Sequence, residues 1–476
     1  SGYSEQDPEA WVEQTWHALR EITSETDPEA IEGISFSGQM HGLVLLDKDR
    51  RVLRNAILWN DTRTSQECRE MKQRAEEIVR SITKNPILEG FTLPKILWVK
   101  RHEPALFQAA DVFLLPKDYV RYRLTGQLHM DYSDAAGTLL LDVANKKWSE
   151  ELCRMFDLPL TLCPPLLESH ALAGTVLPDV AEKTGLSPNT KVFAGGADNA
   201  CGAVGAGILQ DGLTLCSIGT SGVILTYQQG ESVSQEELCE QFDDDRPDIG
   251  GYPGNIHYFN HAKEAAYYAM GVTLSAGRSL SWYKQHFAPD VSYEQLFAEA
   301  KQVPPGARGL LFAPYLSGER TPHGDAFIRG SFIGVDASHT RAEFTAAVLE
   351  GITYSLLQSV EIFREAGRPA DTIISIGGGA RSDAWLQMQA DIFSAKVVKL
   401  KSEQGPGMGA AMLAAYGCGW FESLDQCANA FIQHAEVFEP RPAHSEAHLK
   451  AYRIYKEIYG QTKVWNERLH ELRKEW

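Results

Sequence analysis

The stretch KVFAGGADNACG, residues 191–202, points to the fold class because it has the form of a strand that runs into a glycine turn. The apolar residues in 191–194 predict a strand, and the small residues after it let backbone amides approach a ligand closely. In open α/β sheets, ligands bind beyond the carboxyl ends of the strands. Asp198 and Asn199 therefore occupy a position typical of a binding site, although capping of a helix at 199–205 explains them about as well.

Three further segments have the same form, a short strand followed by a turn of small residues: 35–42, 217–222 and 375–380. Each turn taken alone is more simply a tight connection, because glycine is the default turn residue. Four such turns in one chain favour a ligand cleft over four unrelated connections.

Gly219, Thr220 and Ser221 lie in one of these turns and offer successive N–H groups and two hydroxyls, which suit phosphate oxygens. The turn is not a Walker loop, because no Gly-Lys-Ser/Thr follows it. The three glycines at 377–379 likewise lack the GxGxxG spacing of a dinucleotide fingerprint. The chain therefore predicts phosphate contacts that belong to neither of these two nucleotide motifs.

Strand-like and helix-like segments alternate along the chain, which predicts layered α/β domains. A domain holds about 100–200 residues, so a chain of 476 residues is expected to form at least two. The predicted strands are 31–36, 43–46, 52–59, 191–194, 213–218, 310–314 and 373–376, and the predicted helices are 262–286, 344–365, 383–393 and 448–476.

The composition is acidic, with 45 Lys and Arg against 63 Asp and Glu and a net charge of −18. Such a surface repels nucleic acid and anionic lipid, so neither partner is expected. Acidic residues dominate 229–254, which is interpreted as a solvated surface insertion. The eight cysteines form no CxxC pair, which favours a reducing compartment. The chain has neither an apolar run of about 18 residues nor a signal segment, so that compartment is expected to be the cytoplasm.

Taken together, these segments resemble the FGGY carbohydrate kinases, and within them the xylulokinases. The resemblance covers nearly the whole chain, with the acidic 229–254 stretch as an apparent insertion. The family's two broad signatures correspond to 90–98 and 330–351. The shorter matching segments are 37–42, 58–63, 115–119, 133–138, 195–202, 217–222, 314–323 and 377–382.

The resemblance implies two actin-like, ribonuclease-H-like α/β domains that flank a catalytic cleft. Residues 1–207 are expected to form the sugar-binding domain, and residues 208–476 the nucleotide-binding domain. The β-hairpin with which the family opens has no match in this chain, so the first domain is expected to lack it.

The resemblance also assigns roles to single residues. Asp198 is expected to be the general base, and Mg²⁺ is expected to bridge the phosphates of ATP, with Asp198 contacting the metal through a water molecule. The expected sugar contacts are Met40, His41, Asn199 and, less securely, Trp59. The expected nucleotide contacts are Gly219, Thr220, Ser221, Gly277, Gly378, Gly379 and Asp383.

The reaction that the resemblance implies is ATP-dependent phosphorylation of D-xylulose to D-xylulose 5-phosphate, a step of pentose catabolism. Kinases of other ketoses, polyols or gluconate stay open as alternatives, because a few contacts read the hydroxyl stereochemistry. A non-catalytic, sugar-binding pseudokinase is a further alternative, which the unmatched hairpin motivates. The oligomeric state is open, with a homodimer as one option.

Overall fold

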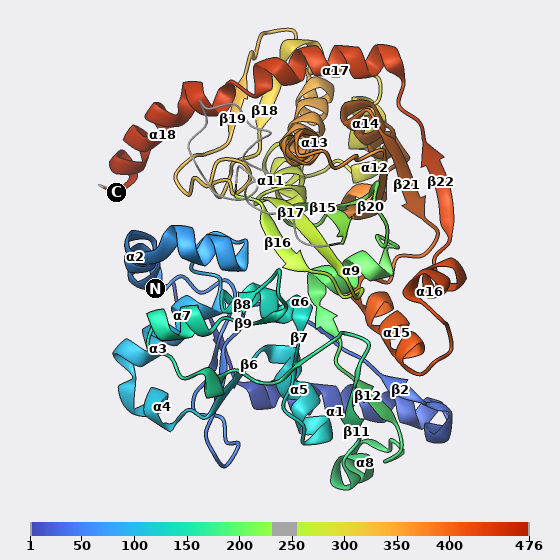
Figure 1. Ribbon diagram of the computed structural model, residues 1–476. Coiled ribbons are helices and arrows are strands. Elements are labelled where there is room, and N and C mark those ends of the chain that lie inside the picture. The colour runs from blue at the N-terminus through green and yellow to red at the C-terminus, as the bar shows by residue number, and fades with distance from the viewer. Residues whose placement is uncertain (1, 231–254, 475–476) are drawn as a thin grey trace.

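The structure is a computed structural model, in which residues 2–230 and 255–474 are described. The chain forms two α/β parts, which lie below and above the middle of the molecule in Figure 1. The predicted acidic insertion at 229–254 lies outside the described residues, except for Gln229 and Gly230.

The N-terminal part begins with a helix whose start is set by its sequence. Asp7 caps α1 (Pro8–Glu25) by accepting a hydrogen bond from the amide of Glu9, and Pro8 occupies the first turn, where no amide hydrogen is needed. The other helices of this part are α2 (Ser65–Thr83), α3 (Thr92–His102), α4 (Pro104–Ala109), α5 (Pro116–Thr125), α6 (Tyr132–Ala135), α7 (Glu150–Met155), α8 (Pro178–Thr184) and α9 (Asp198–Gly205).

Short strands pair in small groups in the N-terminal part rather than forming one wide sheet. β11, β12 and β2 form a three-stranded sheet, and the others pair as β1–β5, β4–β6, β8–β9, β10–β7 and β13–β3. The bounds are β1 (Glu5–Gln6), β2 (Gly33–Ile34), β3 (Ser37–Gly38), β4 (Val44–Leu46), β5 (Ala56–Ile57), β6 (Val112–Leu114), β7 (Met130–Asp131), β8 (Leu141–Asp142), β9 (Lys147–Trp148), β10 (Leu166–Leu167), β11 (Leu172–Thr175), β12 (Lys191–Phe193) and β13 (Gly196–Ala197).

A seven-stranded sheet in the order β16-β17-β15-β14-β20-β21-β22 forms the centre of the C-terminal part. Its middle strands β14, β20 and β21 are parallel, and they are rich in the β-branched and apolar residues that buried parallel strands require. The bounds are β14 (Leu213–Ile218), β15 (Gly222–Gln229), β16 (His257–Asn260), β17 (Ala266–Thr273), β20 (Thr372–Gly377), β21 (Lys396–Leu400) and β22 (His434–Phe438), with β18 (Leu311–Ala313) and β19 (Ser331–Ile333) as a separate pair.

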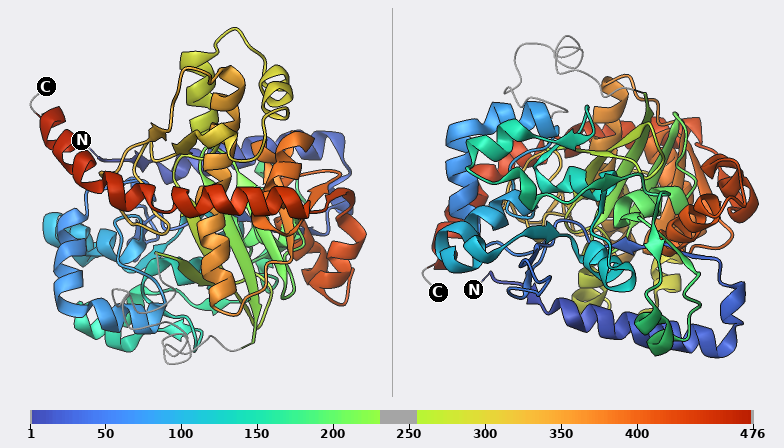
Figure 2. Two further views of the ribbon diagram at one scale, coloured as in Figure 1. Left: turned by 90° about the horizontal axis from the view of Figure 1, so that it is seen from above. Right: turned by 60° about the horizontal axis from the view of Figure 1, so that its bottom comes forward.

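Helices cover this sheet, and the longest of them is buried along most of its length. α13 (Arg341–Glu365) starts at a capping box in which Thr340 and Glu343 exchange hydrogen bonds with each other's backbone amides. The left view of Figure 2 shows α13 lengthwise, with the C-terminal helix α17 crossing it. The remaining bounds are α11 (Gly277–Phe287), α12 (Tyr293–Ala300), α14 (Asp383–Phe393), α15 (Gly405–Gly417), α16 (Leu424–Phe431), α17 (Pro442–Tyr455) and α18 (Ile458–Lys474).

The helix predicted for 262–286 is wrong in its first half. Residues Ala266–Thr273 form β17, and the helix α11 begins only at Gly277. Every residue of β17 is buried, so no polar face marks the strand period of two. Aromatic and apolar residues on both faces of a strand give a pattern that cannot be told from a buried helix.

Hydrogen bonds and a helix pair join the two parts. Asn85 exchanges two hydrogen bonds with the backbone of Tyr258, from Nδ2 to the carbonyl (2.7 Å) and from the amide to Oδ1 (3.0 Å). Helices α9 and α15 pack closely, since a Cβ on Gly409 would lie 1.9 Å from the carbonyl oxygen of Cys201.

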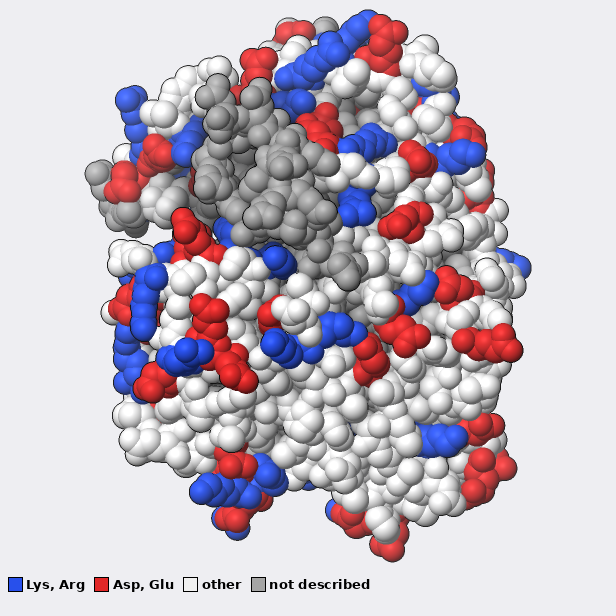
Figure 3. All heavy atoms as spheres, viewed as in Figure 1, with Lys and Arg blue, Asp and Glu red and all other residues white. Residues whose placement is uncertain are grey.

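On the face shown in Figure 3, acidic and basic side chains are intermixed in small groups and form no single basic patch. None of the described helices is long and apolar enough to cross a membrane.

Candidate functional site

The pairing of β3 with β13 brings two of the predicted turns together. The strands are parallel, and Gly38 lies opposite Ala197 in their register. Met40 and His41 follow the end of β3, and Asp198 follows the end of β13. The carboxyl ends of adjacent parallel strands share one edge, so the side chains after them converge.

Direct contacts join the residues that follow these strands. The side-chain amide of Asn199 donates to Met40 Sδ (3.7 Å) and to Asp198 Oδ1 (3.1 Å). The backbone amide of Asn199 also donates to Asp198 Oδ1 (2.7 Å). These bonds fix one oxygen of Asp198 and leave Oδ2 without a hydrogen-bond partner among the residues that the structure describes. We call Met40, His41, Asp198 and Asn199 the Asp198 site.

Asp198 has the proton affinity of a group suited to proton transfer. Burial raises its pKa to about 6, and the hydrogen bond from the amide of Asn199 opposes this effect only partly. A general base works best when its pKa lies near the operating pH. At neutral pH this carboxylate is ionised and still has appreciable affinity for a proton.

His41 is held in one orientation and one protonation state. Its backbone is left-handed, with φ of 68°, and its Nδ1 lies 2.6 Å from the carbonyl oxygen of Gly137. Burial and the nearby charge of Lys95 lower its pKa to about 3, so the ring is neutral. A carbonyl can only accept, so Nδ1 carries the hydrogen and Nε2 is left as an acceptor. His41 therefore presents a hydrogen-bond acceptor to whatever lies beyond it.

Lys95 supports the strained turn at His41, a role that the sequence alone did not predict. Its ammonium group is fully buried and donates to the carbonyl oxygens of His41 (2.9 Å) and Gly90 (2.7 Å). The hydroxyl of Thr92 donates to the same carbonyl of His41 (3.1 Å). Burial lowers the pKa of Lys95 to about 7. Its sequence signal was the lysine inside an apolar helix, which is costly to bury without a specific use.

The glycine turns after β14 and β20 also lie side by side. These strands are parallel, and Ile218 lies opposite Gly377. Gly377 has φ of 80°, and a Cβ on Gly379 would lie 2.7 Å from the side chain of Ile218, so only glycine allows this close approach. Gly378 and Gly379 thus lie at the same edge of the sheet as Gly219.

Gly277 connects to the Gly219 turn from the start of α11. Its amide donates to the carbonyl of Gly219 (2.9 Å), and the amide of Arg278 donates to the carbonyl of Thr220 (3.1 Å). A Cβ on Gly277 would lie 2.3 Å from the oxygen of Gly219. The structure therefore gathers Gly219, Thr220, Ser221 and Gly277 in one place, beside Gly378 and Gly379.

Two predicted site residues make no side-chain hydrogen bond to these groups within the part of the chain that the structure describes. Asp383 is in the first turn of α14, where its carboxylate pairs with Lys399 Nζ at 2.7 Å and is 61% exposed. Trp59 is 52% exposed, and within residues 2–230 and 255–474 no hydrogen bond or ring contact joins it to the Asp198 site.

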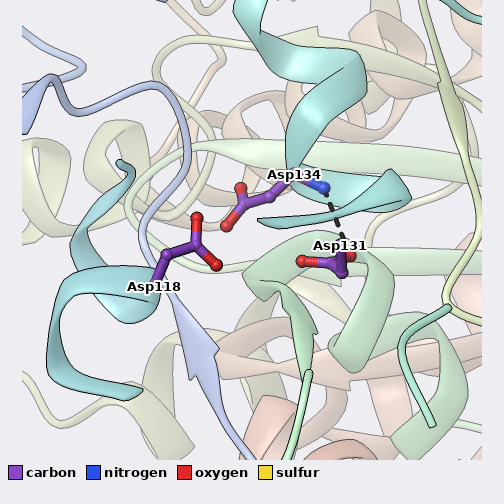
Figure 4. A group of neighbouring side chains, drawn as sticks. All are labelled: Asp118, Asp131 and Asp134. Carbon is purple, nitrogen blue, oxygen red and sulfur yellow. Dashed lines mark hydrogen bonds between the residues drawn. The ribbon is translucent and has the colours of Figure 1, made fainter. Parts of the chain in front are cut away.

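Three buried carboxylates behind the Asp198 site form a cluster with metal-like geometry. Oxygens of Asp118, Asp131 and Asp134 lie within 4.8 Å of one another, and Figure 4 shows the three side chains pointing inward from separate elements. Lys117 Nζ fills the centre, at 2.8, 2.6 and 2.9 Å from an oxygen of each carboxylate in that order. A metal ion would have to displace this ammonium group, so the cluster is an internal ion network rather than a metal site.

The charges of this network balance if one carboxyl group is protonated. Arg121 adds a second cation by pairing with Asp118 at 2.9 Å. Burial and the neighbouring charges of Asp131 and Asp118 raise the pKa of Asp134 well above its usual value, although Lys117 opposes them. With Asp134 neutral, two carboxylates face two cations, which keeps unpaired charge out of the interior.

The network reaches the Asp198 site through Ser133. The hydroxyl of Ser133 donates to Asp131 Oδ2 and accepts a hydrogen bond of 3.0 Å from the amide of Ala197. Arg121 also donates to the carbonyl of Ala194 (2.6 Å). Both ends of the segment that leads into Asp198 are therefore tied to the buried ions.

Asp198 also has a carboxylate oxygen that is free within the described chain, a type of ligand that suits a magnesium ion. Mg²⁺ is usually held by one or two carboxylates together with substrate phosphates and water. The unbonded Oδ2 of Asp198 offers one such ligand. The Asp118, Asp131 and Asp134 cluster does not, because Lys117 already occupies it.

Comparison with known proteins gives a family and a set of relatives. A model of the N-terminal domain of the FGGY family of carbohydrate kinases matches residues 1–205, and a model of its C-terminal domain matches residues 214–418. A xylulose kinase from Bacillus subtilis (strain 168) is 56% identical over 476 residues, which are 100% of this chain and 92% of that protein.

Two solved structures from Lactobacillus acidophilus are equally similar in fold. One is of a ligand-bound xylulose kinase and the other of a gluconate kinase. Each superposes with a TM-score of 0.90 at 26% sequence identity, and each match covers 98% of this chain and 92% of that one. The fold alone therefore does not distinguish these two sugars.

Proposed function

Because the chain belongs to the FGGY family of carbohydrate kinases, we propose that it transfers the γ-phosphoryl group of ATP to D-xylulose and forms D-xylulose 5-phosphate. The observation that carries this proposal is the register of β3 and β13, which brings Met40, the residue before His41, into contact with Asn199 beside Asp198. The 56% identity to a xylulose kinase over the whole chain supports D-xylulose as the substrate.

In the proposed reaction, Asp198 is the general base. Its Oδ2 accepts the proton of the terminal hydroxyl of the open-chain sugar, and the hydroxyl oxygen attacks the γ-phosphorus in line. A new O–P bond forms, the bond from the γ-phosphorus to the β-phosphate oxygen breaks, and ADP leaves with that electron pair. The pKa of about 6 supports this role, since Asp198 is ionised at neutral pH.

The sugar is proposed to bind against Met40, His41 and Asn199. His41 offers Nε2 as an acceptor for a sugar hydroxyl, and Asn199 keeps Asp198 oriented through its amide. Trp59 stays a candidate sugar contact, because its exposed ring would be free to cover a bound sugar.

ATP is proposed to bind at the other glycine turns. Backbone amides and hydroxyls of Gly219, Thr220 and Ser221 suit phosphate oxygens, and Gly277 holds this turn in shape. Gly378, Gly379 and Asp383 would line the adenosine, with Asp383 exchanging or sharing its contact with Lys399. When bound, Mg²⁺ would supply charge that offsets the phosphates, and Asp198 would contact it through a water molecule, which leaves Oδ2 able to accept the proton.

A coupled assay of ADP release tests this proposal. The protein is assayed with D-xylulose, other ketoses, polyols and gluconate, and we expect the highest kcat/KM with D-xylulose. Higher kcat/KM with gluconate would instead favour the function of the second solved relative. Sugar binding by calorimetry with no ADP release from any sugar would indicate a non-catalytic sugar-binding protein.

A further inference from the structure

His257 is a buried histidine that the proposed reaction does not yet use. It is the first residue of β16, the edge strand of the seven-stranded sheet, and it is 3% exposed. Neither Nδ1 nor Nε2 has a hydrogen-bond partner among residues 2–230 and 255–474. Buried polar atoms are nearly always paired, so two bare nitrogens on one ring require an explanation.

The ring of His257 lies in a cluster of four rings that spans the two parts of the protein. It stacks on Phe259 with a centroid distance of 5.8 Å and an interplanar angle of 8°, and it lies 5.7 Å from Phe91. Phe91 is also 4.6 Å from the ring of His41, which in turn is 6.3 Å from Phe259. His41 and His257 therefore approach the same phenylalanines from opposite parts of the chain.

A phenylalanine at position 257 would keep this stacking and have no unpaired nitrogen. The two faces of the strand explain the orientation: residues 257 and 259 share one face because side chains alternate along a strand. That face meets Phe91 and His41. Packing therefore explains an aromatic ring at this position, but it does not explain an imidazole.

The charge around His257 defines what it can bind. Burial, with the nearby charge of Arg320, lowers its pKa well below the usual value, so the ring is neutral. A neutral imidazole has one donor and one acceptor. Within the described residues the guanidinium of Arg320 makes no hydrogen bond or ion pair, and its neighbouring charges are Glu319 and Glu89. The hydroxyl groups of a polyhydroxyl ligand both donate and accept, so they can pair with both nitrogens of this ring.

We propose that His257 is a substrate-binding residue that hydrogen-bonds a hydroxyl or the carbonyl of the open-chain sugar, opposite His41. The inference rests on the proposed function, since it assigns a further contact to the same sugar. Through this contact, the C-terminal part of the chain binds the sugar directly and contributes to sugar specificity. The sugar would then touch both parts at once and be enclosed between them.

Two variants of His257 and one matched control test this inference. His257→Phe keeps the ring and removes both nitrogens, whereas His257→Asn keeps one donor and one acceptor. His261→Phe is the control, because His261 is equally buried but accepts a hydrogen bond from the amide of Lys263 and has no ring contact with His41 or Phe91. Rates of ADP release are measured against D-xylulose and against ATP, together with the melting temperature of each variant.

We expect His257→Phe to raise the KM for D-xylulose at least about ten-fold and to leave the KM for ATP within about two-fold. Its melting temperature should equal or exceed that of the wild type, because two unpaired nitrogens are removed. His257→Asn should recover part of the sugar affinity. His261→Phe should lower the melting temperature without changing the KM for D-xylulose.

A KM for D-xylulose within about two-fold of wild type in His257→Phe would overturn the inference, and water would then be the partner of the nitrogens. Histidine labelled with ¹⁵N gives a second measurement, in which D-xylulose should shift the His257 signal of the wild-type protein. An unshifted signal at saturating sugar contradicts the inference even if the variants fail to fold. If the wild type phosphorylates no sugar, the proposed function has failed, and calorimetric binding of D-xylulose to wild type and His257→Phe decides the inference separately.

Discussion

The backbone amide of Ala197 donates a hydrogen bond of 3.0 Å to the hydroxyl of Ser133, one residue before the carboxylate of Asp198. Ser133 is itself bonded to Asp131, one of the three carboxylates around Lys117. The proposed base is therefore positioned by a buried ion network as well as by its own strand.

Replacing Asp198 with Asn should lower kcat with D-xylulose by about 10²–10⁴-fold, because the proton acceptor is lost while the shape is kept. Sugar binding measured by calorimetry should be retained. Asp179→Asn, which changes an exposed carboxylate on α8, is the control and should keep the wild-type kcat. Wild-type turnover in Asp198→Asn would exclude Asp198 as the base.

The kcat/KM for D-xylulose should fall as the pH drops below about 6, because the pKa of Asp198 is about 6 and protonation removes its base function. The profile is measured with ATP and the metal kept saturating at each pH. A limb near pH 4, the range of an ordinary aspartate, would contradict the effect of burial on this carboxyl group.

Asp198→Asn should also stabilise the folded protein at high pH. Because burial raises the folded-state pKa from 3.8 to about 6, the ionised carboxylate destabilises the fold above pH 6, by at most about 3 kcal/mol. The gain should shrink as the pH falls through 6 and vanish below the unfolded-state value near 4. Urea unfolding at pH 8 and at pH 4 measures the difference, and an equal gain at both values would disagree with this linkage.

Gly277→Ala should weaken ATP binding selectively. Its Cβ would lie 2.3 Å from the carbonyl oxygen of Gly219, so the phosphate turn must move. A shift of this size should raise the KM for ATP by about ten-fold or more and change the KM for D-xylulose little. Gly460→Ala on α18, where the new methyl meets open space, is the control and should leave both values unchanged.

Lys95→Met should raise the KM for D-xylulose, because the carbonyl oxygens of His41 and Gly90 lose the ammonium group that holds them. We expect an increase of about ten-fold and a loss of about 1–3 kcal/mol in the free energy of unfolding, since the carbonyl of Gly90 loses its ammonium partner and that of His41 keeps only the hydroxyl of Thr92. Steady-state kinetics and urea unfolding measure the two effects. Lys183→Met, at an exposed pair on α8, should show neither.

Much of the site could be predicted from the sequence because it consists of turns directly after strands. Asp198, His41 and Gly219 stand at the carboxyl ends of short apolar runs, and the register of β3 with β13 and of β14 with β20 then brings the turns together. The helix predicted at 383–393 has the observed bounds of α14, Asp383–Phe393, and the structure shows that Ser382 caps it.

The rest depends on contacts between segments far apart in the sequence. β17 has no polar face, so its local pattern did not separate strand from helix. Lys95 and His257 are single polar residues inside apolar segments. Only the fold shows that Lys95 holds the turn at His41 and that the ring nitrogens of His257 have no hydrogen-bond partner in the described chain. Lys117 lies in the matching segment 115–119, but the sequence does not reveal that its charge is shared by three carboxylates.

Lys117 is a counter-ion that the chain carries with it. A bound metal can be removed by a chelator or diluted away, whereas an ammonium group on a peptide chain cannot leave the cluster of Asp118, Asp131 and Asp134. The folded N-terminal part therefore needs no divalent cation at this cluster. Depletion of magnesium should then affect the nucleotide and leave the architecture around Asp198 intact.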